Sequence, residues 1–142
     1  MIPVRPWLVI GRYRDTQNPN WLQSRQISAM LQLAAPVSQP GIVSRYLAVE
    51  DGEPLAHDLL REGVAFVREQ RAAGKNILVA CGAGISRSAT YVVAALKEEE
   101  GLSLVEGLRD LRAVHPAALP HMALWESLCD YYDEPFDYWD II

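Results

Sequence analysis

The stretch from Asn76 to Lys97 constrains the fold more than any other part of this chain. It begins with a short apolar run, residues 76–80, whose length and composition are typical of a strand. The loop that follows reads Cys81-Gly82-Ala83-Gly84-Ile85-Ser86-Arg87. Residues 89–97 then have the composition of a helix. A cysteine is therefore predicted at the end of a strand, and an arginine at the start of a helix.

The loop between Cys81 and Arg87 has the properties of an anion-binding site. Its five residues can curl so that successive backbone N–H groups converge on an anion, and the following helix adds the positive end of its dipole. Gly82 and Gly84 let the backbone approach the anion closely, and the Arg87 guanidinium can bind two phosphate oxygens at once. The phosphate-binding residues are therefore predicted to be Gly82, Ala83, Gly84, Ile85, Ser86 and Arg87.

Cys81 is the candidate nucleophile at the base of this loop. The positive field that holds an anion also stabilises a thiolate, which is the reactive form of cysteine. The Ser88 hydroxyl can donate to the sulfur and help it leave when water hydrolyses a phosphocysteine. The alternative is a small buried cysteine beside a glycine turn. Two glycines, Arg87 and Ser88 in this order favour the catalytic interpretation.

The pattern Cys-x5-Arg-Ser resembles the signature of the cysteine-dependent protein tyrosine phosphatase superfamily. Residues 83–90 are most similar to its dual-specificity branch, and the similarity extends from about residue 7 to about residue 132. The resemblance implies a phosphomonoester hydrolase that works through a phosphocysteine, with no metal or other cofactor. The implied substrates are phosphotyrosine, phosphoserine and phosphothreonine in proteins or peptides.

Cleavage of a phosphomonoester also needs a proton donor for the leaving oxygen. Asp51, in the turn at residues 49–52, matches the position of the family's general acid. The neighbouring carboxylates Glu50, Glu53 and Asp58 are rivals, although Glu50 is expected to point to the opposite face and Asp58 to lie inside a helix. Without the resemblance, a turn or helix-capping aspartate, which is common, is the favoured interpretation of Asp51.

Two positions depart from the family pattern. A histidine usually precedes the nucleophile, where this chain has Ala80, and we expect its absence to affect the rate more than the reaction type. An asparagine often follows the proline that opens the last helix, where this chain has Pro120-His121. His121 is therefore a candidate for supporting the loop, the alternative being an exposed histidine.

Strands and helices are predicted to alternate along the chain. Apolar patterns indicate strands at residues 7–10, 27–33, 43–49 and 77–80, and helices at 55–71, 89–97, 103–114 and from 120 onward. Pro54 is assigned to the first turn of the helix at 55–71, Ser103 and Glu106 form a capping box, and His115-Pro116 ends that helix. We expect a single α/β domain, residues 1–142, with a central, mostly parallel sheet of about four to five strands flanked by helices. The cysteine loop then lies at the carboxyl end of a central strand, where such sheets bind ligands.

Composition narrows the class of protein further. Half of the 142 residues are apolar, which is enough for one hydrophobic core, and the net charge of −5 argues against nucleic-acid or anionic-membrane partners. No apolar run has membrane-spanning length, and residues 1–7 lack the apolar core of a signal peptide. A reactive thiol favours a reducing compartment. We expect a cytoplasmic monomer whose partner is a phosphorylated protein or peptide, with no metal.

The sequence is also compatible with other functions. The substrate can be a non-protein phosphomonoester, such as a phosphoinositide, a nucleotide or RNA 5′ end, or a phosphoglucan. Arg87 is the only fixed charge of the loop, and the lack of further lysines or arginines there disfavours a phosphoinositide. Ala80 motivates a weakly active phospho-binding module, although binding alone does not need the thiol. A rhodanese-like sulfur carrier and an arsenate reductase fit less well, because Asp51 and Ser88 suit phosphate chemistry and no second cysteine lies near the loop in sequence.

Overall fold

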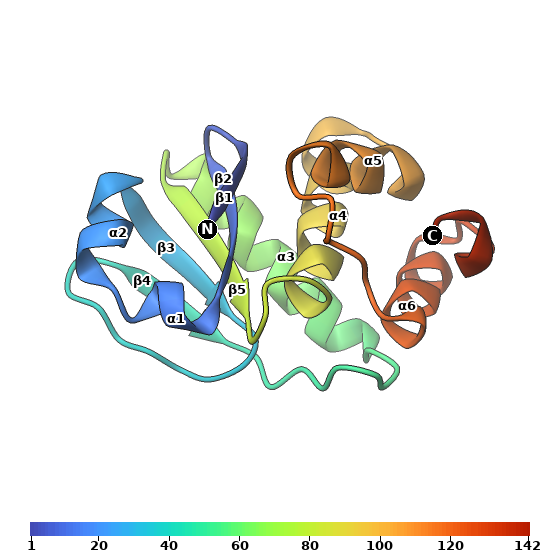
Figure 1. The fold of residues 1–142 in the computed structure, drawn as a ribbon, viewed down its shortest axis with the longest axis horizontal. Coiled ribbons are helices and arrows are strands. Elements are labelled where there is room, and N and C mark those ends of the chain that lie inside the picture. The colour runs from blue at the N-terminus through green and yellow to red at the C-terminus, as the bar shows by residue number, and fades with distance from the viewer.

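A five-stranded sheet forms one half of the computed structural model, which describes residues 1–142 (Figure 1). Strands β2, β5, β3 and β4 are parallel, and β1 pairs with β2 in the antiparallel direction. The order across the sheet is β1-β2-β5-β3-β4, which confirms the prediction of a mostly parallel sheet. The strand bounds are β1 (Ile2–Arg5), β2 (Leu8–Arg12), β3 (Ile27–Gln32), β4 (Val43–Tyr46) and β5 (Asn76–Cys81).

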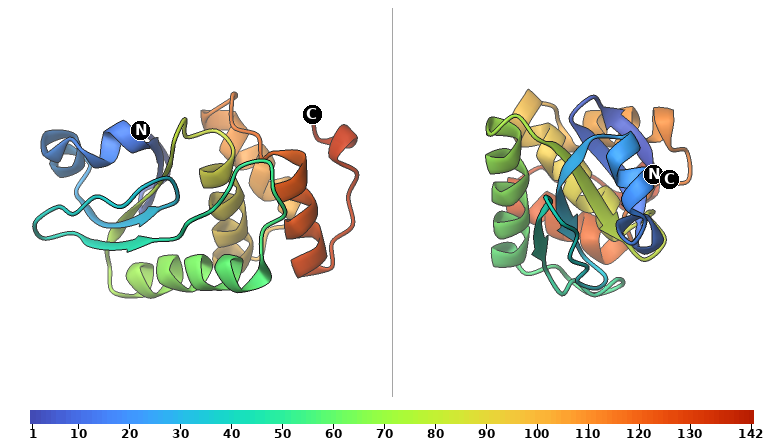
Figure 2. Two further views of the ribbon diagram at one scale, coloured as in Figure 1. Left: turned by 90° about the horizontal axis from the view of Figure 1, so that it is seen from below. Right: turned by 90° about the vertical axis from the view of Figure 1, so that its left-hand side faces the viewer.

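Helices cover both faces of this sheet (Figure 2). The short helices α1 (Tyr13–Thr16) and α2 (Pro19–Ser24) lie on one face, and α3 (His57–Ala72) lies on the other. The alternation of side chains along β5 divides the core accordingly. Leu78 and Ala80 belong to a small cluster with Leu22 of α2, whereas Val79 and Cys81 belong to the main core.

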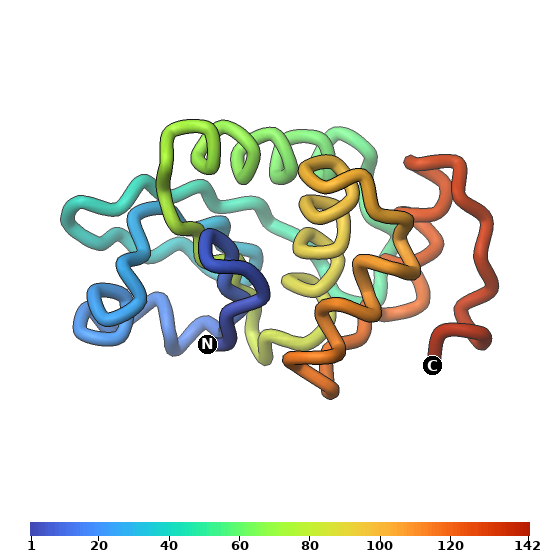
Figure 3. Tube along the Cα trace, turned by 90° about the horizontal axis from the view of Figure 1, so that it is seen from above, coloured from blue at the N-terminus to red at the C-terminus, as the bar shows by residue number.

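The main core is organised around α4 (Arg87–Glu100), which follows β5 directly. Every residue of α4 from Ser88 to Leu96 is buried, as its apolar sequence predicts. The helices α3, α5 (Leu104–Val114) and α6 (Met122–Tyr132) surround α4 (Figure 3). The C-terminal segment, with the 3₁₀ turn η1 (Tyr138–Asp140), lies beside α6 at the end of the molecule away from the sheet. A helix buried on all sides is a rigid support for the loop that precedes it.

Several boundaries differ from the sequence prediction. Strand β1 and helix α1 were not predicted, since each has only four residues. Strand β4 ends at Tyr46 instead of continuing to residue 49, although the N–H of Leu47 still donates to the carbonyl of Gln32. Pro54 lies before α3 and not in its first turn, because Ala56 is the N-cap residue. None of the helices combines the length and the apolar character needed to cross a bilayer.

Candidate active site

Cys81 lies at the carboxyl end of β5, and residues 82–86 connect it to α4 (Figure 1). Its side chain is buried, and Sγ lies 3.2 Å from the Oγ of Ser88. Ser88 is fully buried on the first turn of α4. The strand and the helix therefore fix the thiol and the hydroxyl against each other, in the arrangement that their spacing in the sequence suggests.

Three carbonyl groups of the loop accept hydrogen bonds from the surrounding protein. The Gly84 carbonyl accepts a hydrogen bond from Nε2 of His115 at 2.9 Å. The Ile85 carbonyl accepts from the N–H of Leu119 at 3.0 Å, and the Ser86 carbonyl accepts from the N–H and the hydroxyl of Thr90. By contrast, the N–H groups of residues 82–86 donate to no acceptor in the chain. The loop thus keeps a row of free donors beside the sulfur, as an anion-binding loop requires.

The path of the loop depends on glycine at position 84. Gly84 has a φ of +70°, a conformation that other residues adopt at a cost. A Cβ atom there would lie 2.8 Å from the carbonyl oxygen of Gly11, at the end of β2. The loop therefore passes directly over the neighbouring strand, which a side chain at this position would prevent.

Arg87 is held in place by two backbone carbonyls. Its Nη1 donates to the carbonyl oxygens of Leu33 at 3.3 Å and of Val49 at 3.1 Å, which follow β3 and β4. Its Nη2 lies 3.1 Å from the point where a Cβ on Gly82 would be, so this nitrogen faces the loop. The donors on Nη2 and Nε remain free for an oxyanion. The guanidinium is thus oriented before any ligand binds.

Asp51 is the carboxylate that contacts the loop. Its Oδ1 accepts a hydrogen bond from the Ser86 hydroxyl at 2.6 Å. Among its rivals, Glu50 and Glu53 are exposed and make no hydrogen bond to the loop, and Asp58 pairs with Arg61 on α3. The structure therefore brings Cys81, Arg87, Ser88 and Asp51 to one edge of the sheet.

Two histidines lie beside the loop and contact it in different ways. His121 contacts the loop through its backbone N–H, which donates to the Ser86 Oγ at 2.8 Å. Its ring instead caps α6, because Nδ1 accepts from the N–H of Ala123. The ring that touches the loop is that of His115, which sequence reasoning treated only as a helix end. Nothing in the local sequence indicates a contact with Gly84, 31 residues earlier.

The C-terminal segment lies beside the Asp51 turn. The hydroxyl of Tyr138 donates to the carbonyl of Pro120 at 2.9 Å. Burial raises the pKa of Tyr138, and the negative charge of Asp51 acts in the same direction while Arg112 opposes it. Trp139, the next residue, is 67% exposed. The Tyr138 hydroxyl thus joins the C-terminal segment to the residue that precedes His121.

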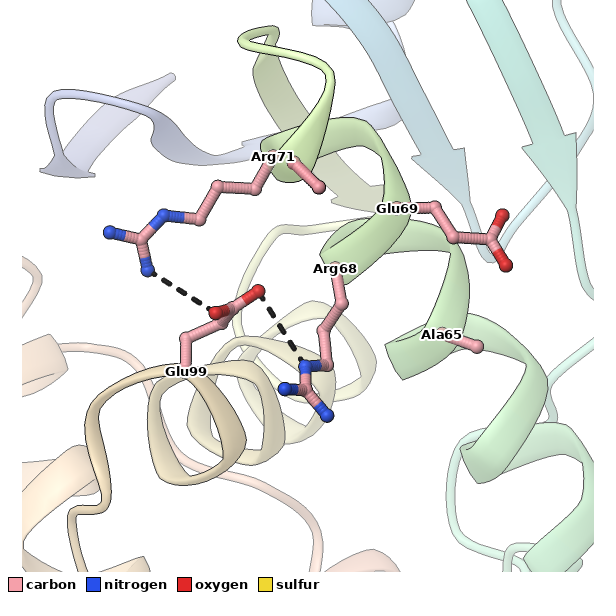
Figure 4. Close-up of a pocket in the computed structure, with 6 residues that line it drawn as sticks. Ala65, Arg68, Glu69, Arg71 and Glu99 are labelled. Carbon is pink, nitrogen blue, oxygen red and sulfur yellow. Dashed lines mark ion pairs between the residues drawn. The ribbon is translucent and has the colours of Figure 1, made fainter.

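A concave region lies between α3 and the end of α4 (Figure 4). Arg68 and Arg71 both point toward Glu99, at 3.6 Å and 3.5 Å. Arg68 also pairs with Glu98 at 3.2 Å, so two carboxylates balance the two guanidinium groups. This region lies at the C-terminal end of the helix whose N-terminal end carries Arg87, so it is separate from the thiol site.

The comparisons with known proteins point to one family. The family model described as "Dual specificity phosphatase, catalytic domain" matches residues 8–134. The curated protein "Dual specificity protein phosphatase 22-B" of Danio rerio is 29% identical over 134 residues, which cover 90% of this chain and 72% of that protein. "Dual specificity protein phosphatase 1" of Arabidopsis thaliana is 30% identical over 127 residues, which cover 87% of this chain and 64% of that protein.

A solved structure shows the same relationship in three dimensions. The crystal structure of human DUSP28 superposes with a TM-score of 0.86 at 25% sequence identity, and the match covers 94% of this chain and 96% of that one. The agreement includes nearly all of the sheet and the helices, which confirms the expected phosphatase-like α/β fold.

Proposed function

The chain belongs to the family of dual specificity phosphatases, which are cysteine-dependent protein phosphatases, and on that premise we propose which residues carry the reaction and what it acts on. The proposed catalytic domain spans residues 1–142. Its proposed substrates are phosphotyrosine, phosphoserine and phosphothreonine monoesters in a protein or peptide. We also propose that the protein acts as a cytoplasmic monomer.

In the first step, the thiolate of Cys81 attacks phosphorus in line with the leaving oxygen. The free N–H groups of residues 82–86 and the free nitrogens of Arg87 bind the equatorial phosphate oxygens. The bond from phosphorus to the leaving oxygen breaks as the P–S bond forms. Protonated Asp51 gives its proton to the leaving oxygen.

In the second step, water attacks the phosphocysteine and releases inorganic phosphate. Asp51, now ionised, takes a proton from that water. The thiolate leaves, and the Ser88 hydroxyl at 3.2 Å stabilises its returning charge by donating a hydrogen bond. The cycle restores both the thiolate and the protonated acid without a cofactor.

The observation that carries this proposal is that the loop's carbonyl groups and its N–H groups differ in their hydrogen bonding. The carbonyls of Gly84, Ile85 and Ser86 are engaged by outside donors, while the N–H groups of residues 82–86 are free. A loop that merely turned the chain would not need this separation. Free donors, an oriented guanidinium and a thiol at one point support phosphoryl transfer.

The direct test compares the two cysteines of the chain. We expect Cys81→Ser to lose essentially all turnover of an aryl phosphate while still binding vanadate. Cys129→Ser is the matched control, since Cys129 is half-buried on α6 and outside the site, and it should keep turnover. Unchanged hydrolysis by the Cys81→Ser protein would refute the proposal.

The role of Asp51 has its own test. A general acid matters most for a poor leaving group, and its loss typically lowers the rate about 10²- to 10⁴-fold. We expect Asp51→Asn to slow phosphoserine peptides far more than p-nitrophenyl phosphate in steady-state kinetics. An equal loss for both substrates would assign the acid elsewhere, and a panel that adds phosphoinositides and nucleotides would test the substrate class.

A further inference from the structure

The Ser86 side chain does not do what its position in the helix predicts. Ser86 is the N-cap residue of α4, where a serine normally accepts a hydrogen bond from the first turn of the helix. No such bond is present. The hydroxyl instead bridges two distant segments, the turn that carries Asp51 and the start of α6. The interaction forgone is typically worth about 1 kcal/mol, so the bridge requires an explanation.

The geometry fixes the direction of each hydrogen bond in this bridge. The N–H of His121 can only donate, so it occupies one lone pair of the Ser86 oxygen, at 2.8 Å. This leaves one O–H donor and one lone pair for Asp51, whose Oδ1 lies at 2.6 Å. The hydroxyl can therefore donate to the ionised carboxylate and accept from the protonated acid. The same contact suits both protonation states that a general acid–base group passes through.

Little else holds the carboxyl group of Asp51. Residues 50–53 are exposed, and the bond from Ser86 is the only side-chain hydrogen bond that Asp51 makes. Gly52, next in the chain, has a φ of +84° and packs near the ring of His121. Ser86 and the start of α6 thus determine where the Asp51 carboxyl lies relative to the phosphate loop.

We infer that Ser86 is a positioning residue for Asp51, and that its hydroxyl transmits the position of the α6 N-terminus to the proton donor. The inference rests on the proposed function, because it takes Asp51 as the general acid. It adds a role for the side chain to the role of the Ser86 backbone in binding phosphate. Without the Ser86 hydroxyl, the thiol and the loop N–H groups stay in place, but the Asp51 carboxyl loses its position.

The test measures how kcat depends on the leaving group, in the chain of 142 residues. Ser86→Ala is expected to lower kcat for a phosphoserine peptide at least tenfold more than for p-nitrophenyl phosphate, with vanadate affinity unchanged. Ser86→Thr keeps a hydroxyl and should restore the selectivity. In an Asp51→Asn background, Ser86→Ala should cause no further loss, because the group that it positions is already gone.

Thr90→Val is the matched control for loop support. The Thr90 hydroxyl also bonds to Ser86, but at the carbonyl oxygen, and it does not touch Asp51. We expect this variant to slow both substrates equally. If Ser86→Ala behaves in the same way, or loses vanadate affinity in parallel with kcat, Ser86 supports only the loop and the inference is wrong. Asp51→Asn alone distinguishes failure of the proposed function from failure of the inference. If Asp51→Asn slows both substrates equally, Asp51 is not the general acid. If Asp51→Asn slows the phosphoserine peptide more and Ser86→Ala does not, only the inference about Ser86 is wrong.

Discussion

At the scale of single residues, the phosphate loop is supported mainly by one short segment, residues 115–121. His115 and Leu119 each donate a hydrogen bond to a loop carbonyl, and His121 donates to the Ser86 side chain, which also contacts Asp51. The residue before Cys81 takes no part, since Ala80 lies in the small cluster with Leu22, on the face of the sheet opposite the main core. The ring in contact with the loop is that of His115.

The His115 contact predicts a measurable loss of anion affinity. We expect His115→Ala to weaken vanadate binding about two- to tenfold, because one hydrogen bond is worth about 0.5–1.5 kcal/mol and the Gly84 carbonyl loses its donor. Isothermal titration calorimetry can measure this. His57→Ala is the control, since His57 lies on α3 and pairs with Asp130. Equal affinities in the two variants would mean that the brace has no energetic role.

At the scale of elements, glycines set how closely α3 and α5 approach the buried α4. A Cβ on Gly63 of α3 would lie 2.3 Å from the ring of Tyr91, which is fully buried. A Cβ on Gly107 of α5 would lie 3.5 Å from the Val93 carbonyl oxygen, an ordinary contact. The α3–α4 contact therefore requires glycine, and the α4–α5 contact tolerates alanine.

This difference predicts that a glycine-to-alanine substitution changes the free energy of unfolding in opposite directions at the two positions. Gly63→Ala should lower the free energy of unfolding by about 1–3 kcal/mol through overpacking. Gly107→Ala should raise it by about 0.5–1 kcal/mol, because alanine is the better helix former. Urea denaturation followed by circular dichroism measures both. Destabilisation by Gly107→Ala of the size seen with Gly63→Ala would contradict this account of helix packing.

The sequence predicts the longer helices and strands better than the short ones. Strand β5, helix α4 and the capped helix α5 have strong apolar patterns or capping residues, and the structure confirms all three. Elements of four residues, β1 and α1, carry too little pattern to be recognised. The spacing of Cys81, Arg87 and Ser88 also places them together, because they follow one another along a single turn. The contacts of His115 and of Ser86 with Asp51 join residues 31 and 35 positions apart, so only the tertiary structure shows them.

At the scale of the whole molecule, stability at high pH depends on groups inside the main core. Tyr91 is fully buried, and its hydroxyl donates to the Leu59 carbonyl at 2.9 Å, which ties α4 to α3. Burial raises the pKa of Tyr91 above its ordinary value near 10, and the charge of Glu62 adds to this. The neutral Tyr91 phenol therefore contributes its full stabilisation below about pH 10. This stabilisation is lost as the pH rises toward the raised pKa of the folded state.

Tyr91→Phe should therefore change the pH dependence of stability. Below about pH 10, the variant should be less stable than the parent by about 0.5–1.5 kcal/mol, because the bond to Leu59 is lost. Above that pH the gap should narrow, because only the parent must keep this phenol neutral to stay folded. Denaturation midpoints measured across the alkaline range test this. A gap independent of pH would show that Tyr91 does not couple ionisation to folding.

We propose that a phosphoryl group passes through the sulfur of Cys81 during turnover, and this phosphocysteine can be trapped. In the Ser88→Ala protein the thiolate loses the hydroxyl at 3.2 Å that helps it leave, so hydrolysis of the intermediate slows and phosphoenzyme accumulates. The measurement is an acid quench during turnover of a phosphotyrosine peptide, followed by mass spectrometry of the proteolytic fragments. We predict one phosphoryl group on the fragment that contains Cys81, on the sulfur. Sustained turnover with no phosphoryl group at Cys81, or with the group on another side chain, would contradict the account.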